Sequence, residues 1–136
     1  MTRPAPLYAA VMAGSSLGAI ARFACSLAMV SLFGPGFPWG TLAVNVLGSF
    51  LIGLYATITE PDGCLRVSPA MRQFVIAGFC GGFTTFSIFS LETVLLIEDG
   101  RLALGAANLI ISLVCWFGAV WLGYRLGEKL NGRQRL

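Results

Sequence analysis

The fold of this chain depends on the stretch Gly81-Gly82-Phe83-Thr84-Thr85-Phe86-Ser87-Ile88-Phe89-Ser90-Leu91-Glu92. It places two glycines, several hydroxyls and a carboxylate inside a segment otherwise apolar enough to cross a bilayer. Two glycines followed by two β-branched threonines are poor helix formers, so we expect a helix that breaks near Gly81 to Thr85 and frees backbone carbonyls. Lipid tolerates such a break only where protein or a water-filled path surrounds it. The stretch therefore predicts an ion site at membrane depth, or else a Gly/Thr-rich packing face between helices.

Composition places the chain among integral membrane proteins. Of its 136 residues, 57% are hydrophobic and 11% are charged, and the mean hydropathy is +0.81. Four apolar stretches, approximately residues 7–33, 39–58, 74–97 and 102–126, each reach the ~20 residues that a spanning helix needs. Short connectors rich in Gly, Pro and Asp separate them. We therefore expect an all-α membrane protein with four transmembrane helices in a single domain, residues 1–136, located in the cell membrane as a multi-pass protein.

Several function classes lack their residues. The chain has no His, no phosphate-binding loop of the Walker type and no Ser/His/Asp set, so we expect neither an enzyme nor a nucleotide-driven pump. The first apolar stretch is too long for a cleaved secretory signal. The four cysteines have no close spacing of the kind that binds metals, and they are expected to pack as small apolar residues. The net charge of +3 reflects arginines beside the helices and does not indicate a nucleic-acid surface.

Small and polar residues recur every fourth position in the first span. Ala10, Gly14, Gly18, Arg22 and Ser26 form one stripe along a helix, which permits close approach of a second helix. A guanidinium within a span costs ~2.5–3.5 kcal/mol on insertion scales and must find acceptors. Arg22 is therefore expected to be a structural anchor, bonded to neighbouring carbonyls or reaching one interface.

Two further spans carry amides and hydroxyls on one face. The second span has Asn45, Ser49 and Gly53 at intervals of four, and the fourth has Asn108 and Ser112. An Asn side chain offers two N–H donors and one acceptor, which can replace the water around an ion. The alternative is that each Asn joins two helices through a hydrogen bond, typically worth ~0.6 kcal/mol in membranes. Two such faces together with a broken third helix favour a polar path.

The groups available along this path favour an anion. Hydroxyls, amides and one cation, Arg22, stand against a single carboxylate, Glu92, whereas cation pathways use rings of carboxylates or carbonyls. Phe86 and Phe89 lie three residues apart on one helical face. The edge of an aromatic ring carries partial positive charge that can face an anion; alternatively, both rings pack against lipid or protein.

With these motifs, the chain resembles the Fluc-type fluoride channel family over essentially its whole length. The resemblance rests on GSSLGAIARF at 14–23, GTLAVNVLGSF at 40–50, GFCGGFTTFSIFSLE at 78–92 and the segment 108–123, in that order. It implies a small four-helix protein that assembles as an antiparallel dimer. It also implies two fluoride pores, a central structural sodium ion, and a role in passive export of fluoride from the cytoplasm.

The resemblance also implies roles for individual residues. Asn45, Phe86 and Phe89 match the pore asparagine and the paired pore phenylalanines of the family. The residues that match its other polar positions are Ser87, Ser90, Glu92 and Ser112, and Asn108 stands where family members often have Tyr. The sodium ligands would be the backbone carbonyls of Gly81 and Thr84.

Two alternatives to a fluoride channel are a small four-helix multidrug exporter and a membrane assembly subunit that transports nothing. A proton-coupled exporter needs a carboxylate in its first helix, where this chain has Arg22 and no Asp or Glu.

Charge at the two membrane surfaces is uneven. If four helices span the bilayer, one side receives seven basic residues, Arg3, Arg66, Arg72, Arg125, Lys129, Arg133 and Arg135, and the other receives only Arg101. Such a bias normally places both termini in the cytoplasm. An antiparallel dimer needs both orientations. We therefore expect either a homodimer that inserts both ways despite its charges or a pairing with an oppositely oriented homologue.

Overall fold

The protein is built from four long helical segments. A computed structural model describes residues 4–133, in which α1 spans Pro4–Phe33 and α2 spans Trp39–Ile58. The third segment is divided into α3 (Pro69–Gln73), the π-helix η1 (Phe74–Cys80), α4 (Gly81–Phe83) and α5 (Ser87–Glu98), and α6 spans Leu102–Arg133. Each of the four segments is long and apolar enough to cross a membrane. The predicted all-α membrane architecture with an interrupted third helix is therefore present.

The helix ends follow local sequence signals. The second helix has the predicted bounds because Pro38 precedes it and the turn at Thr59 ends it. The third segment begins at Pro69, five residues before the predicted start at 74. There the Ser68 hydroxyl accepts a hydrogen bond from the Met71 N–H at 3.2 Å, and Pro at the first helical position suits a helix start. The fourth helix extends past the predicted end at residue 126 to Arg133, so its charged last turns are also helical.

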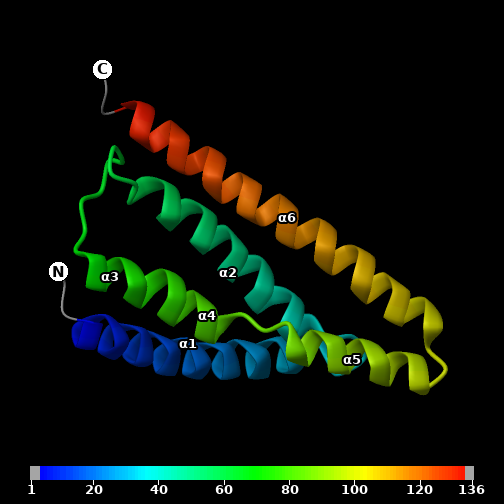
Figure 1. Ribbon diagram of the computed structural model, residues 1–136. Coiled ribbons are helices and arrows are strands. Elements are labelled where there is room, and N and C mark those ends of the chain that lie inside the picture. The colour runs from blue at the N-terminus through cyan, green and yellow to red at the C-terminus, as the bar shows by residue number, and fades with distance from the viewer. Residues whose placement is uncertain (1–3, 134–136) are drawn as a thin grey trace.

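Two pairs of helices form the body of the molecule (Figure 1). The α2 helix packs along α6, and α1 packs along η1 and α4. Both contacts rely on glycine: a Cβ on Gly14 or Gly18 would overlap carbonyl oxygens of η1, and one on Gly123 would overlap the carbonyl oxygen of Phe50 in α2. The predicted close approach at the Gly14–Gly18 stripe is confirmed.

The two ends of the bundle are tied by polar contacts. At one end, the Asn131 side chain accepts a hydrogen bond from the Cys64 N–H at 2.9 Å and donates to the Thr57 carbonyl at 3.1 Å. At the other end, Arg101 donates to the Gly36 carbonyl. Between the ends, large apolar side chains cover the outer surface, for example Phe23, which is 67% exposed. Such a surface is suited to lipid, and the chain is a multi-pass membrane protein.

Candidate functional site

The interruption of the third segment lies slightly beyond the glycines. Gly81 and Gly82 remain helical in α4, and the backbone becomes extended at Thr84, with φ −85° and ψ 161°. Helical structure resumes at Ser87 after Phe86. Figure 1 shows the thin connection between α4 and α5. The break therefore comprises residues 84–86, at the end of the predicted window of 81–85.

Asn45 of α2 holds this break in place. Its Nδ2 donates to the Thr85 carbonyl at 2.8 Å, and its Oδ1 accepts from the Thr85 N–H at 2.7 Å. In a continuous helix, the Thr85 N–H would donate to the Gly81 carbonyl four residues earlier. Since Asn45 takes that N–H, the Gly81 carbonyl loses its helical donor. One N–H of the Asn45 amide remains uncommitted among the described hydrogen bonds.

Thr85 also starts the next helix, a role that the sequence analysis did not assign. Its hydroxyl accepts from the Ile88 N–H at 3.3 Å and lies 3.3 Å from the Ser87 hydroxyl. Phe86 holds the N-cap position of α5 and makes no side-chain cap, so the Thr85 hydroxyl, one residue earlier, accepts from an N–H of the first turn instead. The sequence signal for this role is the position of Thr85 three residues before Ile88, the first apolar residue of α5.

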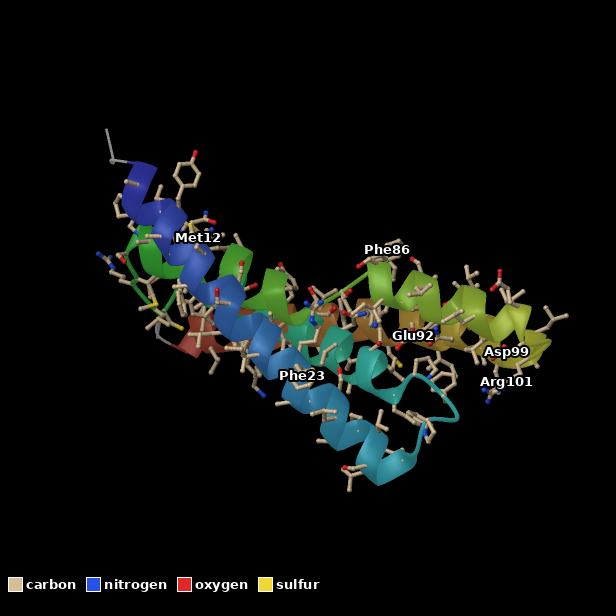
Figure 2. The ribbon with its side chains drawn as sticks, turned by 90° about the horizontal axis from the view of Figure 1, so that it is seen from below. Met12, Phe23, Phe86, Glu92, Asp99 and Arg101 are labelled. Carbon is tan, nitrogen blue, oxygen red and sulfur yellow. The ribbon has the colours of Figure 1, made fainter. Side chains whose placement is uncertain are left out.

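The paired phenylalanines lie where the second half of the segment begins. Their ring centroids are 5.7 Å apart, but Phe86 is 69% exposed and Phe89 only 3%. Figure 2 shows Phe86 at the start of α5, projecting away from the bundle. Phe89 packs against Trp116 of α6 with centroids 4.7 Å apart and an edge-to-face angle of 70°. The Ser90 hydroxyl bonds back to the Phe86 carbonyl at 2.9 Å.

Asn108 and Ser112 form a buried polar cluster between α5 and α6. Asn108 Nδ2 donates to the Thr93 hydroxyl at 2.9 Å, and the Ser112 hydroxyl donates to Asn108 Oδ1 at 3.3 Å. Thr93 in turn donates to the Phe89 carbonyl at 2.7 Å. Asn108 therefore joins two helices, as in the packing alternative above. Its predicted pore role stays a prediction.

Arg22 and Glu92 contribute to the wall of a second region. The Arg22 Nη1 donates to the Thr84 carbonyl at 3.3 Å, which confirms the expectation that the guanidinium bonds to a neighbouring carbonyl. Glu92 and Thr41 line the same cavity, and the Glu92 Oε2 is buried with no hydrogen-bond partner in the described part of the chain. This cavity, of about 630 Å³, which we call the outer cavity, is also lined by Arg22 and Arg101.

A second cavity, of about 340 Å³, lies on the other side of the break, and we call it the break cavity. Its wall includes Asn45, Ser49, Thr84, Phe86 and Trp116 together with Gly81 and Thr85. Thr85 lines both cavities. The backbone that Asn45 holds is thus a partition between two hollows.

The structure brings most of the predicted residues to this partition. Asn45, Thr84 and Phe86 line the break cavity directly, and Ser87 and Ser90 bond to atoms of residues 85 and 86. Phe89 connects them to the Asn108 cluster through Thr93. Glu92 stands apart on the outer cavity; Figure 2 shows it on α5 between Phe86 and Asp99.

The sequence of this chain matches a known family. Residues 9–124 match the model of the family described as CrcB-like protein, Camphor Resistance (CrcB). The chain belongs to the CrcB-like family. The match includes every residue predicted for the ion site, from Arg22 to Ser112.

Curated relatives are similar over nearly their whole length. The chain is 51% identical over 127 residues to "Fluoride-specific ion channel FluC 1" of Rhodopseudomonas palustris, covering 93% of this chain and 90% of that protein. It is 48% identical to "Fluoride-specific ion channel FluC 1" of Bradyrhizobium diazoefficiens, covering 98% and 92%. It is 47% identical to "Fluoride-specific ion channel FluC" of Opitutus terrae, covering 92% and 95%. These CrcB relatives carry one common name.

Proposed function

We propose that this chain is a fluoride-selective channel that passively exports fluoride across the cell membrane and lowers its cytoplasmic level. The names of the CrcB relatives support this function. The structural observation that carries it is the break held by Asn45 between two cavities. A backbone interruption at membrane depth is suited to a water-lined path.

Fluoride selectivity follows from the kind of groups at this partition. Fluoride is small and strongly hydrated, so a narrow path must replace its water with donors while binding it weakly enough for release. The break cavity offers the free N–H of Asn45, the hydroxyl of Ser49 and the ring of Phe86. None of these carries a fixed positive charge that would trap the ion. The outer cavity is lined by Arg22 and Arg101 and also by Glu92 and Asp99, so its formal charges balance.

The pore roles of individual residues are part of this proposal. Phe86 and Phe89 would present ring edges to a partly dehydrated anion, and the hydroxyls of Ser87, Ser90 and Ser112 would continue the path beside them. Glu92 would set the charge of the outer cavity, which it lines. Its Oε2 has no hydrogen-bond partner in the described residues. No covalent chemistry is needed.

We further propose an antiparallel dimer with a structural sodium ion at its centre. Hard cations prefer oxygen ligands, and the Gly81 carbonyl is without its helical donor because Thr85 bonds to Asn45. A Cβ on Gly81 would meet open space, so a partner subunit could approach there. The Thr84 carbonyl already accepts from Arg22, so the ion would share that oxygen with a guanidinium. Exchange of sodium for N-methylglucamine should lower the crosslinked dimer fraction; an unchanged fraction would refute the sodium site.

The two alternatives predict different transport. A proton-coupled exporter needs a carboxylate in its first helix, and α1 of this chain, Pro4–Phe33, has no Asp or Glu. A subunit without transport would leave the two cavities without a role.

Fluoride efflux from proteoliposomes separates the three functions. Purified protein in liposomes loaded with potassium fluoride should release fluoride, measured with an electrode, once valinomycin permits compensating potassium efflux. Liposomes loaded with chloride serve as the comparison and should release little. Fluoride release no faster than from empty liposomes would refute the function, and efflux of an organic cation driven by a pH gradient would support the exporter.

A further inference from the structure

The two backbone carbonyls proposed to bind sodium have both lost their helical donors. In a continuous α-helix, each carbonyl accepts from the N–H four residues later. The Thr85 N–H donates to Asn45 at 2.7 Å, so the Gly81 carbonyl loses its donor. The Ile88 N–H donates to the Thr85 hydroxyl at 3.3 Å, so the Thr84 carbonyl loses its donor. The break therefore frees two oxygens within one turn of backbone.

Arg22 of α1 takes one of these two oxygens. Its Nη1 donates to the Thr84 carbonyl at 3.3 Å. A backbone carbonyl without a donor costs free energy, and at membrane depth no water is at hand to replace the donor. In a single subunit, the guanidinium therefore satisfies the Thr84 oxygen from the neighbouring helix.

The same contact places a fixed positive charge beside a proposed sodium ligand. Four charged residues line the outer cavity, Arg22, Glu92, Asp99 and Arg101, and among them it is Arg22 that hydrogen-bonds to the break. A sodium ion on the Thr84 oxygen would be a close neighbour of this guanidinium. Like charges so close repel one another more strongly in a protein interior than in water. Arg22 and sodium therefore compete for one oxygen.

We propose that Arg22 is a positioning residue that holds the Thr84 carbonyl in the free subunit and opposes sodium there, so that the ion binds only when two subunits supply their carbonyls together. A hard cation needs several oxygen ligands at once. One subunit offers the free Gly81 oxygen and a second oxygen that already serves a cation. The inference rests on the sodium-bridged dimer of the proposed function, and it adds the residue that couples ion binding to assembly.

Two substitutions separate the charge of Arg22 from its hydrogen bond. Arg22→Gln removes the charge and keeps N–H donors, whereas Arg22→Lys keeps the charge. The dimer fraction on crosslinking is measured across a sodium series in which N-methylglucamine holds the ionic strength constant. The sodium concentration that gives half of the maximal dimer should fall about tenfold in Arg22→Gln, which corresponds to about 1.4 kcal/mol. It should stay near the wild-type value in Arg22→Lys.

Arg101→Gln is the matched control. Arg101 also donates from its guanidinium to one backbone carbonyl, that of Gly36, and it lines the same cavity. It lies in the connection between α5 and α6 and does not bond to the break. The half-maximal sodium concentration of Arg101→Gln should equal that of the wild type.

Thermal unfolding gives a second readout that needs no crosslinker. Sodium stabilises the form that binds it, so the Tm rises with sodium concentration, and this rise should begin at about tenfold lower sodium in Arg22→Gln. Arg22→Met is a second neutral variant and should behave in the same way. Neutral variants with the wild-type sodium dependence, or an equal fall in Arg22→Lys, would overturn the inference alone. Absence of any sodium dependence in the wild type would refute the sodium site and the inference together.

Discussion

At the scale of single residues, Asn45 connects α2 to the break in the third segment through two hydrogen bonds. Its side-chain nitrogen donates to the carbonyl of Thr85 and its side-chain oxygen accepts from the N–H of the same residue, 40 positions away in sequence. Its spacing in the sequence predicts Asn45 as an ion donor but does not indicate that it holds the break. A contact between segments so far apart leaves no periodic signal in either one. Only the amide's remaining N–H is available for the predicted ion contact.

Substitution of Asn45 should therefore reduce conduction strongly. Asn45→Ala leaves the Thr85 N–H and carbonyl without partners, at ~1–3 kcal/mol for each buried group, and removes the proposed ion donor. Asn45→Asp cannot donate to the Thr85 carbonyl and adds charge. Fluoride efflux from proteoliposomes should fall about tenfold or more in both variants.

Asn131→Ala is a matched control for this experiment. Asn131 also bonds to one backbone N–H and one backbone carbonyl, but it does so at the far end of α6. It should retain efflux near that of the wild type. Wild-type efflux from Asn45→Ala would contradict both roles of Asn45.

Phe89 offers a second test at this scale. Phe89→Ile keeps an apolar side chain but removes the ring edge and the pairing with Trp116, a contact worth ~0.5–1.5 kcal/mol. Fluoride efflux should fall several-fold while the dimer fraction on crosslinking stays constant. The control is Phe79→Ile, which breaks another aromatic pair, with centroids 5.6 Å from Phe83. Equal efflux from both variants would contradict a pore role for Phe89 and would mean that its ring serves only in packing.

At the scale of elements, the sequence predicted what depends on local composition. Hydropathy located four spans, and Pro38 fixed the start of α2. The glycine pair and the threonines located the break to within a few residues, but Gly81 and Gly82 stayed helical. The interruption follows instead from the Asn45 contact. The π-helix η1 packs tightly on α1 and had no signal in the sequence.

The α2 helix packs closely against the break at Gly48. A Cβ at this position would overlap the Thr84 Cγ2, so Gly48→Ala should push the broken backbone away from α2. Overpacking of this kind costs ~1–3 kcal/mol, and fluoride efflux should fall about tenfold.

A second substitution should restore it. Thr84→Ser removes the overlapping methyl and keeps the hydroxyl that donates to the Cys80 carbonyl at 2.9 Å. The double variant Gly48→Ala, Thr84→Ser should therefore recover most of the lost efflux, because the two positions are coupled through one contact. If the double variant were as slow as Gly48→Ala alone, the contact would not be the cause.

At the scale of the whole molecule, orientation in the membrane is the open prediction. Arg66 lies in the connection between α2 and α3, Arg72 in α3, and Arg125 and Lys129 in the last part of α6. Arg101 lies in the connection between α5 and α6. Figure 1 shows the α2–α3 connection and the last turns of α6 at the end of the bundle where α1 begins, and the α5–α6 connection at the opposite end. Arg3 and Arg135 fall outside the described residues. The charge bias favours one orientation, whereas the proposed antiparallel dimer requires both. Lys129 belongs to the continuous α6 helix and is close enough to the span to count toward this bias. We expect the homodimer despite the bias, because the proposed antiparallel dimer needs both orientations.

Cysteine labelling in intact cells distinguishes the two cases. Asp62→Cys and Asp99→Cys place exposed thiols at opposite ends of the bundle, each in a Cys64→Ser background. Dual insertion predicts that a membrane-impermeant reagent labels about half of the molecules of each variant. Complete labelling of Asp99→Cys with protection of Asp62→Cys would instead mean one orientation and a missing partner.

The reversal potential of the purified protein tests fluoride selectivity most directly. In a planar bilayer with opposed fluoride and chloride gradients, a passive fluoride-selective channel gives a current that reverses at the fluoride equilibrium potential. That potential should not move when a pH gradient is added. Reversal at the chloride potential, or a current that follows the proton gradient, would contradict a passive fluoride channel.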